Sequence, residues 1–452
     1  MTRSLGRKQK RATVVVELSV ERLGAQGDGV AQYESAPVFL PFTVPGDRVR
    51  ARLGAARGAG RKGRVVERLA FGPGRVDPPC LHFGRCGGCA LQHLDRASYG
   101  TVKLGALNAA LERVGIDPGL VLPLRVVSPA RRRTRLGLMR PRDPRLPALV
   151  GFRERFRHDL VDLAQCPVLE PELFGNVGEL RLVAPDLLSP GAAAEVTLTR
   201  TDSGVDALFE AAERPGLGAL DALAAFAEKR DLARIVWRSR TEEILVVERR
   251  PVRVVLSGVA VSFPPGGFLQ ASAAAETILV EEVLAGIGPN RPVLDLFAGL
   301  GTFTFALAAA GSVHAVEGDE RAASALARAA AGQHRVTVER RDLAGNPVPP
   351  EALSAYDGAV FDPPRAGAAR QTLALAASPL ATVVAVSCNP ATFARCRPAD
   401  RRRLPPGTGR AGRPVRMDAA SRARGGVPPM STLCSAPFGS PSPSWLQWRS
   451  TL

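Results

Sequence analysis

After residue 290 the chain alternates between short apolar runs and segments of helical character. The runs lie at 292–299, 312–319, 336–343, 356–364 and 381–390. Continuous apolar strands separated by helices form a parallel sheet that is covered on both faces. This part of the sequence therefore predicts a doubly wound α/β domain.

Ligands of such sheets bind beyond the carboxyl ends of the strands, so the residues at these ends form the candidate site. Polar or reactive residues stand at all five ends. They are Asp295 with the loop Phe297–Thr302, then Glu317, Asp342, Asp362 and Cys388. Five such positions together indicate a site more strongly than any one of them.

Two strand ends indicate a cofactor that contains adenosine. Gly299 and Gly301 allow the backbone to approach a ligand closely, although tight turns contain such glycines for steric reasons alone. Glu317 can accept hydrogen bonds from both ribose hydroxyls, and Asp342 would suit the adenine amine. A dinucleotide is disfavoured because Thr304 stands where G-x-G-x-x-G has its third glycine.

The charge of the chain favours a nucleic-acid partner. The 452 residues carry a net charge of +17, with 60 Lys and Arg against 43 Asp and Glu. Neutralising phosphates releases counterions, but a GC-rich coding sequence also places arginine on solvated faces. The basic runs 130–135 and 151–157 have the same two readings: RNA contact or a solvated strand face.

The last two strand ends would form the reactive part of the site. The Pro-Pro turn after Asp362 would fix this side chain toward the cleft, or serve as a structural turn alone. A buried cysteine is usually a small hydrophobic residue, but Cys388 would leave the sheet at the ligand edge, beside a helix N-terminus that favours a thiolate. With RNA and an adenosine cofactor, this cysteine predicts methylation of a pyrimidine at C5, because thiolate addition to C6 activates C5.

Several motifs together resemble the S-adenosylmethionine-dependent RNA 5-methyluridine methyltransferases: VLDLFAGLGTF, AVEGD, FDPPRAG, SCNPATFAR and, upstream, GGFLQAS. The resemblance covers about residues 10–395 and implies a Rossmann-like methyltransferase domain. It implies Cys388 as the nucleophile and six cofactor contacts. These are Gln270, Phe297, Thr302, Glu317, Asp342 and Asp362, with Thr302 at a position where some members carry Asn.

Four of the seven cysteines suggest a metal site. Cys80, Cys86, Cys89 and Cys166 could bind zinc or an iron-sulfur cluster, since both accept four thiolates. The family resemblance favours [4Fe-4S]. Residues 12–70 read as short antiparallel strands of an OB-like barrel, which resembles a TRAM domain. Together these features resemble the bacterial 23S rRNA uracil-5-methyltransferases.

The expected domains are an RNA-binding barrel (10–72), a central α+β domain with the cysteine site (73–265), a methyltransferase domain (266–395) and a divergent tail (396–452). The tail contains ten arginines, nine prolines and no glutamate, whereas the family continues with two strands and a Pro-x-Thr-x-His-x-Glu segment that carries the proton-removing base. Three explanations compete: a divergent tail, a disordered extension and a shift of reading frame near Cys396. The family resemblance ends abruptly inside a helix, which favours the frameshift. We expect an exposed apolar sheet edge as the consequence.

The predicted function is methyl transfer from S-adenosyl-L-methionine to a uridine of 23S rRNA. The alternatives are tRNA uracil-5 methylation and a non-catalytic RNA-binding protein. Methylases of exocyclic amines usually have an aromatic residue where this chain has Arg365, and RNA cytosine-5 enzymes have a second cysteine after the proline of the same motif. No long apolar segment or signal sequence is recognised, so a cytoplasmic protein is expected. We also expect the protein to be a monomer.

Overall fold

The computed structural model describes residues 14–24, 27–58, 60–155, 157–289, 291–390, 431–437 and 449–451. The predicted start of the barrel at residue 10 and most of the tail lie outside these ranges. The chain divides into two compact units, each described here by itself. One comprises residues 1–79 and 89–106, and the other comprises residues 80–88 and 107–452.

The first unit contains a six-stranded sheet. Its strand order is β1 (Val15–Ser19), β5 (Arg48–Arg57), β6 (Gly60–Ala70), β4 (Ala36–Leu40), β3 (Gly29–Tyr33) and β2 (Arg22–Leu23). The strands pair antiparallel except β4 and β6, which pair in parallel. Alternate residues such as Val38 and Leu40, or Val49 and Ala51, are completely buried in one core. This alternation is the pattern from which antiparallel strands were predicted.

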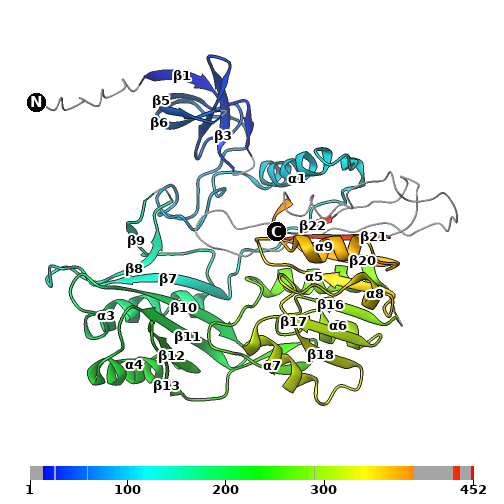
Figure 1. Cartoon of the computed structure of the whole chain (residues 1–452). Coiled ribbons are helices and arrows are strands. Elements are labelled where there is room, and N and C mark those ends of the chain that lie inside the picture. The colour runs from blue at the N-terminus through cyan, green and yellow to red at the C-terminus, as the bar shows by residue number, and fades with distance from the viewer. Residues whose placement is uncertain are drawn as a thin grey trace, which may run out of the picture. The chain divides into compact units, whose positions relative to one another are not determined.

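The second unit begins its regular structure with the end of helix α1 (Arg96–Glu112) and a short 3-10 turn, η1 (Pro118–Leu120). A seven-stranded sheet follows (Figure 1), in the order β13 (Glu243–Glu248), β12 (Arg234–Arg238), β11 (Gly204–Ala211), β10 (Ala193–Thr201), β7 (Arg133–Met139), β8 (Leu149–Arg153) and β9 (Leu160–Asp162). Helices α3 (Val177–Leu187) and α4 (Leu217–Lys229) bury apolar side chains against this sheet, and the short α2 (Pro171–Phe174) precedes them. The central region is therefore α+β, as predicted.

A second sheet in this unit is the predicted doubly wound one. Its order is β18 (Val336–Arg340), β17 (Val313–Glu317), β16 (Val293–Leu296), β19 (Gly358–Phe361) and β20 (Thr382–Ser387), all parallel, followed by β21 (Ser431–Pro437) and β22 (Arg449–Thr451). The helices between and before these strands are α5 (Ala273–Ile287), α6 (Thr304–Ala308), α7 (Glu320–Ala330), α8 (Pro350–Leu353) and α9 (Ala369–Ala376).

Both faces of this sheet are covered. Val293, Val360 and Val384 belong to one buried cluster, which includes residues of α5, α6 and α7. Their strand neighbours Leu294 and Phe361 belong to another cluster, which includes residues of α8, α9 and the end of α1. Successive strand residues point to opposite faces, so continuous apolar runs supply both cores.

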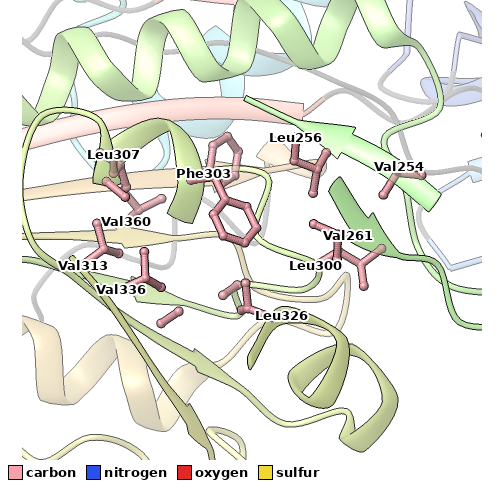
Figure 2. Packing of buried hydrophobic residues seen from close by; sticks show 14 of the residues in the cluster. Val254, Leu256, Val261, Leu300, Phe303, Leu307, Val313, Leu326, Val336 and Val360 are labelled. Carbon is pink, nitrogen blue, oxygen red and sulfur yellow. The ribbon is translucent and has the colours of Figure 1, made fainter. Parts of the chain in front are cut away.

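A hairpin of β14 (Arg253–Leu256) and β15 (Val259–Ser262) extends the first of these cores. Figure 2 shows Phe303 in this core, with Leu256 and Val261 of the hairpin and Leu326 of α7 among the labelled side chains. The core of the methyltransferase-like part thus includes residues that precede position 266.

The tail contributes strands, which contradicts the expectation of an uncovered sheet edge. β21 pairs antiparallel with β20 along its whole length, from Thr382 opposite Pro437 to Ser387 opposite Thr432, and β22 pairs with β21. The prediction failed because it required an apolar run, whereas an available edge strand supplies the hydrogen-bonding partner for the segment STLCSAP whatever its hydropathy. The remaining tail residues, 396–430, 438–448 and 452, lie outside the described ranges.

Within the described ranges, none of the helices is long and apolar enough to span a membrane.

Candidate cofactor and catalytic site

The loop after β16 is held in an unusual conformation by its buried side chains. Phe297, Gly299 and Gly301 have positive φ angles of 64°, 58° and 99°. Leu300 and Phe303 are buried in the core below and anchor the loop. A Cβ atom at position 301 would lie 2.6 Å from Phe305 and 2.7 Å from Leu326, whereas one at position 299 would meet nothing within 4 Å. The loop is thus fixed on its core side and open at Gly299, where a ligand could approach.

Glu317, the last residue of β17, is joined to this loop. Its Oε2 accepts a hydrogen bond from the Gly299 N–H at 2.7 Å, and its Oε1 accepts one from the Asp319 N–H at 2.7 Å. Each carboxylate oxygen can accept a second hydrogen bond. These two hydrogen bonds therefore orient the Glu317 carboxylate at the edge of the sheet. Its oxygens can still accept hydrogen bonds from a diol such as a ribose.

Asp295 lies one residue inside the end of β16 and is completely buried. The Thr304 hydroxyl donates to its Oδ2 at 2.6 Å, and its Oδ1 has no hydrogen-bond partner among the described residues. Burial raises the pKa of this carboxyl to about 7, and the nearby Asp362 and Glu317 carboxylates also raise it. Sequence reasoning placed Asp295 at the site but gave no sign that it is buried.

Gln270, which the sequence predicts as a cofactor contact, precedes α5 and is not part of the sheet. Its side chain is 3% exposed, and its Oε1 has no partner among the described residues. Arg132 fixes the backbone beside it: its N–H donates to the Ala271 carbonyl at 2.8 Å and its Nε to the Gln270 carbonyl at 3.1 Å. Arg132 also binds Glu276 at 2.6 Å. A buried amide oxygen without a partner fits a ligand group that donates a hydrogen bond.

The other predicted cofactor residues lie at the same sheet edge. The Phe297 ring meets the Phe361 ring edge-on, with 5.8 Å between centroids. Thr302 is half-buried in the glycine loop, and Asp342 is exposed two residues after β18. One oxygen of Asp342 accepts a hydrogen bond from the Ala344 N–H at 3.0 Å.

The predicted cofactor contact Asp362 and the predicted nucleophile Cys388 follow two neighbouring strands. β19 and β20 pair in parallel with Phe361 opposite Ala385, so Asp362 and Cys388 follow at the same edge. The Asp362 N–H donates to the Leu296 carbonyl at 3.3 Å, which joins this turn to the end of β16. Cys388 is partly exposed and forms no disulfide. A reactive thiol needs this access, because a fully buried one could not reach a substrate.

The four predicted metal-binding cysteines are Cys80, Cys86, Cys89 and Cys166. Among the described residues, no group of three or more His, Cys, Asp or Glu side chains is arranged to hold a metal ion. Cys80, Cys86, Cys89 and Cys166 are all free of disulfides. His82 accepts a hydrogen bond from the Ala164 N–H at 2.9 Å, so the loop with Cys80 and Cys86 lies beside the segment that precedes Cys166. Four cysteines are donors that an iron-sulfur cluster accepts.

Much of the basic run 130–135 is used inside the protein. Arg132 is mostly buried in the contacts described above, and Arg131 donates to the Gly88 carbonyl at 3.4 Å. Arg135 forms ion pairs with Glu195 and Glu210. The Arg132 contacts had no sequence signal, because Gln270 and Glu276 are more than 130 residues away along the chain.

Comparisons with known proteins give a consistent result. A search of protein-family models found no match. An RNA methyltransferase of Rhizobium meliloti is 39% identical over 387 residues, which cover 84% of this chain and 90% of the relative. The 23S rRNA (uracil(1939)-C(5))-methyltransferase of Chromohalobacter salexigens is 37% identical over 395 residues, 84% of this chain and 82% of the relative.

A solved structure has the same fold over nearly the whole chain. It is the tRNA (uracil-54, C5)-methyltransferase of Pyrococcus abyssi in complex with S-adenosyl-L-homocysteine, with a TM-score of 0.66 at 21% identity. The match covers 93% of this chain and 100% of that one.

Proposed function

Because the chain belongs to the family of S-adenosylmethionine-dependent RNA methyltransferases, we propose that it methylates C5 of a uridine in 23S rRNA through a covalent adduct with Cys388. The observation that carries the proposal is the position of Cys388. This accessible thiol follows the strand next to the one that Asp362 follows, at the edge where the glycine loop and Glu317 lie. An exocyclic-amine methylase would not need a thiol there.

The described residues fit the cofactor. Glu317 has acceptor capacity for the ribose hydroxyls, the unpaired Gln270 Oε1 can accept a hydrogen bond, and the open side of Gly299 leaves room for the ligand backbone. Thr302, Asp342 and Asp362 complete the proposed contacts, with the Phe297 ring beside them. When bound, S-adenosylmethionine supplies an electrophilic methyl group.

The role of Cys388 follows from the chemistry of uracil. C5 is a poor nucleophile until the thiolate Sγ forms a bond with C6, which places electron density on C5. C5 would then take the methyl group as S-adenosylhomocysteine leaves, a base would remove the C5 proton, and the Sγ–C6 bond would break to return the thiolate. The complete sequence of steps returns the cysteine unchanged, as a catalytic nucleophile requires.

The proton-removing base is the unusual part of this chain. The family segment that carries the glutamate base has no counterpart here, since residues 396–452 contain no glutamate. We therefore propose that the covalent adduct forms readily and resolves slowly.

The 23S rRNA substrate is proposed from the name of the Chromohalobacter relative and from the four cysteines and N-terminal sheet, which tRNA-specific relatives usually lack. Transcripts of 23S rRNA and of tRNA, incubated with tritiated methyl donor, distinguish the two substrates. Label in the tRNA alone would overturn the rRNA assignment.

The test of the mechanism uses RNA with 5-fluorouridine. Fluorine cannot leave C5 as a cation, so a protein–RNA adduct should persist in denaturing gels when methyl donor is present. Cys388→Ala should abolish the adduct, while Ser387→Ala, which changes the neighbouring residue, should keep it. An adduct that survives Cys388→Ala would exclude this residue as the nucleophile.

We further propose that Cys80, Cys86, Cys89 and Cys166 bind a [4Fe-4S] cluster. The support is the presence of four cysteines that form no disulfide and the contact between the loop with His82 and the segment before Cys166. Iron and sulfide assays on anaerobically purified protein test this. About four of each per chain are expected, whereas zinc without sulfide would contradict the cluster.

A further inference from the structure

Three carboxylates lie at the ends of three adjacent strands, and the central one is the most enclosed. β16 lies between β17 and β19, so Asp295 lies between Glu317 and Asp362 in strand order. Asp295 is completely buried, and its Oδ1 lacks a partner among the described residues. An isolated buried carboxylate is costly, and two neighbouring carboxylates increase this cost.

The surroundings of Asp295 offer it little compensation. On the same face of the sheet, α6 contributes the Thr304 hydroxyl, which donates to Oδ2 at 2.6 Å, and a weaker hydrogen bond from the Thr304 backbone. The partly buried Glu276 and the buried Glu282, both of α5, form ion pairs with Arg132 and Arg125. The charged groups that act most strongly on Asp295 are both acidic, namely Asp362 and Glu317.

We propose that Asp295 is protonated in the empty protein and ionises when the cofactor binds, so that cofactor binding releases one proton. The inference rests on the proposed function, in which Glu317 and Asp362 contact S-adenosylmethionine. This cofactor brings a positive sulfonium and a positive ammonium group to the site. Their attraction favours the Asp295 carboxylate over the neutral acid, and the proton passes to the buffer.

Isothermal titration calorimetry in phosphate and in Tris measures the released proton, because these buffers differ in ionisation enthalpy. Wild-type protein should release about one proton per cofactor near pH 6 and almost none above about pH 8. Over the lower part of this range its affinity for S-adenosylmethionine should rise about tenfold per pH unit. Asp295→Asn should abolish both the release and the pH dependence.

The control is Asp357→Asn, at the opposite end of β19, which should behave as wild type. If Asp295→Asn does not fold, Thr304→Val replaces it: loss of the hydroxyl donor should extend proton release to higher pH. If the wild type binds S-adenosylmethionine without releasing a proton, the inference about Asp295 is wrong but the proposed function is unaffected. Absence of any binding would instead contradict the proposed function.

Discussion

The buried acids of this protein differ in how their charge is compensated. Burial acts to raise the pKa of Asp47, but hydrogen bonds from Arg75, Gly72 and Val44 lower it below its usual value. Burial raises the pKa of Asp206, although Arg234 donates to it at 2.7 Å. Asp295 has the Thr304 hydroxyl in place of an arginine, and its pKa rises to about 7. Such perturbed groups concentrate at functional sites.

The raised pKa of Asp295 predicts a pH-dependent stability. The pKa of Asp295 is about 4 in the unfolded chain and about 7 in the folded protein. Between these pH values the folded state therefore binds one proton that the unfolded state does not. The contribution of Asp295 to the free energy of unfolding is complete below about pH 4. It is lost as the pH rises to 7, at about 1.4 kcal/mol per pH unit. Urea unfolding from pH 5 to 8 should show this loss in wild type. A difference between wild type and Asp295→Asn that does not vary with pH would contradict it.

At the scale of elements, the glycine loop predicts different effects for two similar substitutions. Gly299 and Gly301 both have positive φ, but only at 301 would a Cβ strike neighbouring side chains. Gly299→Ala should cost about 1 to 2 kcal/mol of stability from backbone strain. Gly301→Ala should cost about 1 to 3 kcal/mol more, since Phe305 and Leu326 must move. Thermal or urea unfolding of both variants tests this, and equal losses would show that the contact is relieved without cost.

The end of β6 predicts an RNA contact in the first unit. Phe71 is 73% exposed, and the guanidinium groups of Arg68 and Arg75 lie 5.9 and 6.0 Å from its ring centroid. Both arginines are held by the buried Asp47. An exposed ring beside fixed cations can stack on an unpaired base, an interaction worth about 1 to 3 kcal/mol.

Phe71→Ala should therefore weaken binding of single-stranded RNA about 5- to 150-fold at constant salt. Fluorescence anisotropy measures this. Val66→Ala on β6, also exposed, is the matched control and should bind as wild type. Unchanged affinity of Phe71→Ala would place the RNA elsewhere.

The sequence predicted the elements whose cause is local. The five parallel strands are continuous apolar runs, and two covered faces require such runs. Elements formed by distant partners were missed: β21 has no continuous apolar run and pairs with β20, and Arg132 contacts the distant residues Gln270 and Glu276. The strand ends could be predicted as a site because parallel topology gathers them, whereas the burial of Asp295 depends on helices packed above it.

For the whole molecule, the missing glutamate predicts an enzyme limited by its last step. Replacing residues 396–452 with a relative's segment that carries Pro-x-Thr-x-His-x-Glu should increase release of methylated RNA about 10²- to 10⁴-fold, the usual contribution of a positioned base. Tritium release from C5-labelled uridine measures proton removal directly. Cys388→Ala in the chimera should remove the gain. A chimera that forms adduct but still releases no RNA would contradict this explanation.

The pairing of β21 with β20 also has a consequence for synthesis on the ribosome. The strand that ends at Ser387, just before Cys388, obtains its outer partner only from residues 431–437. At about 5 to 20 residues per second, the ribosome needs a few seconds to add that partner. During this interval β20 is the open edge of a nascent sheet, the kind of surface that chaperones bind. Ribosome-bound chains stalled before residue 431 should therefore be more sensitive to protease near Cys388 than chains stalled after residue 437.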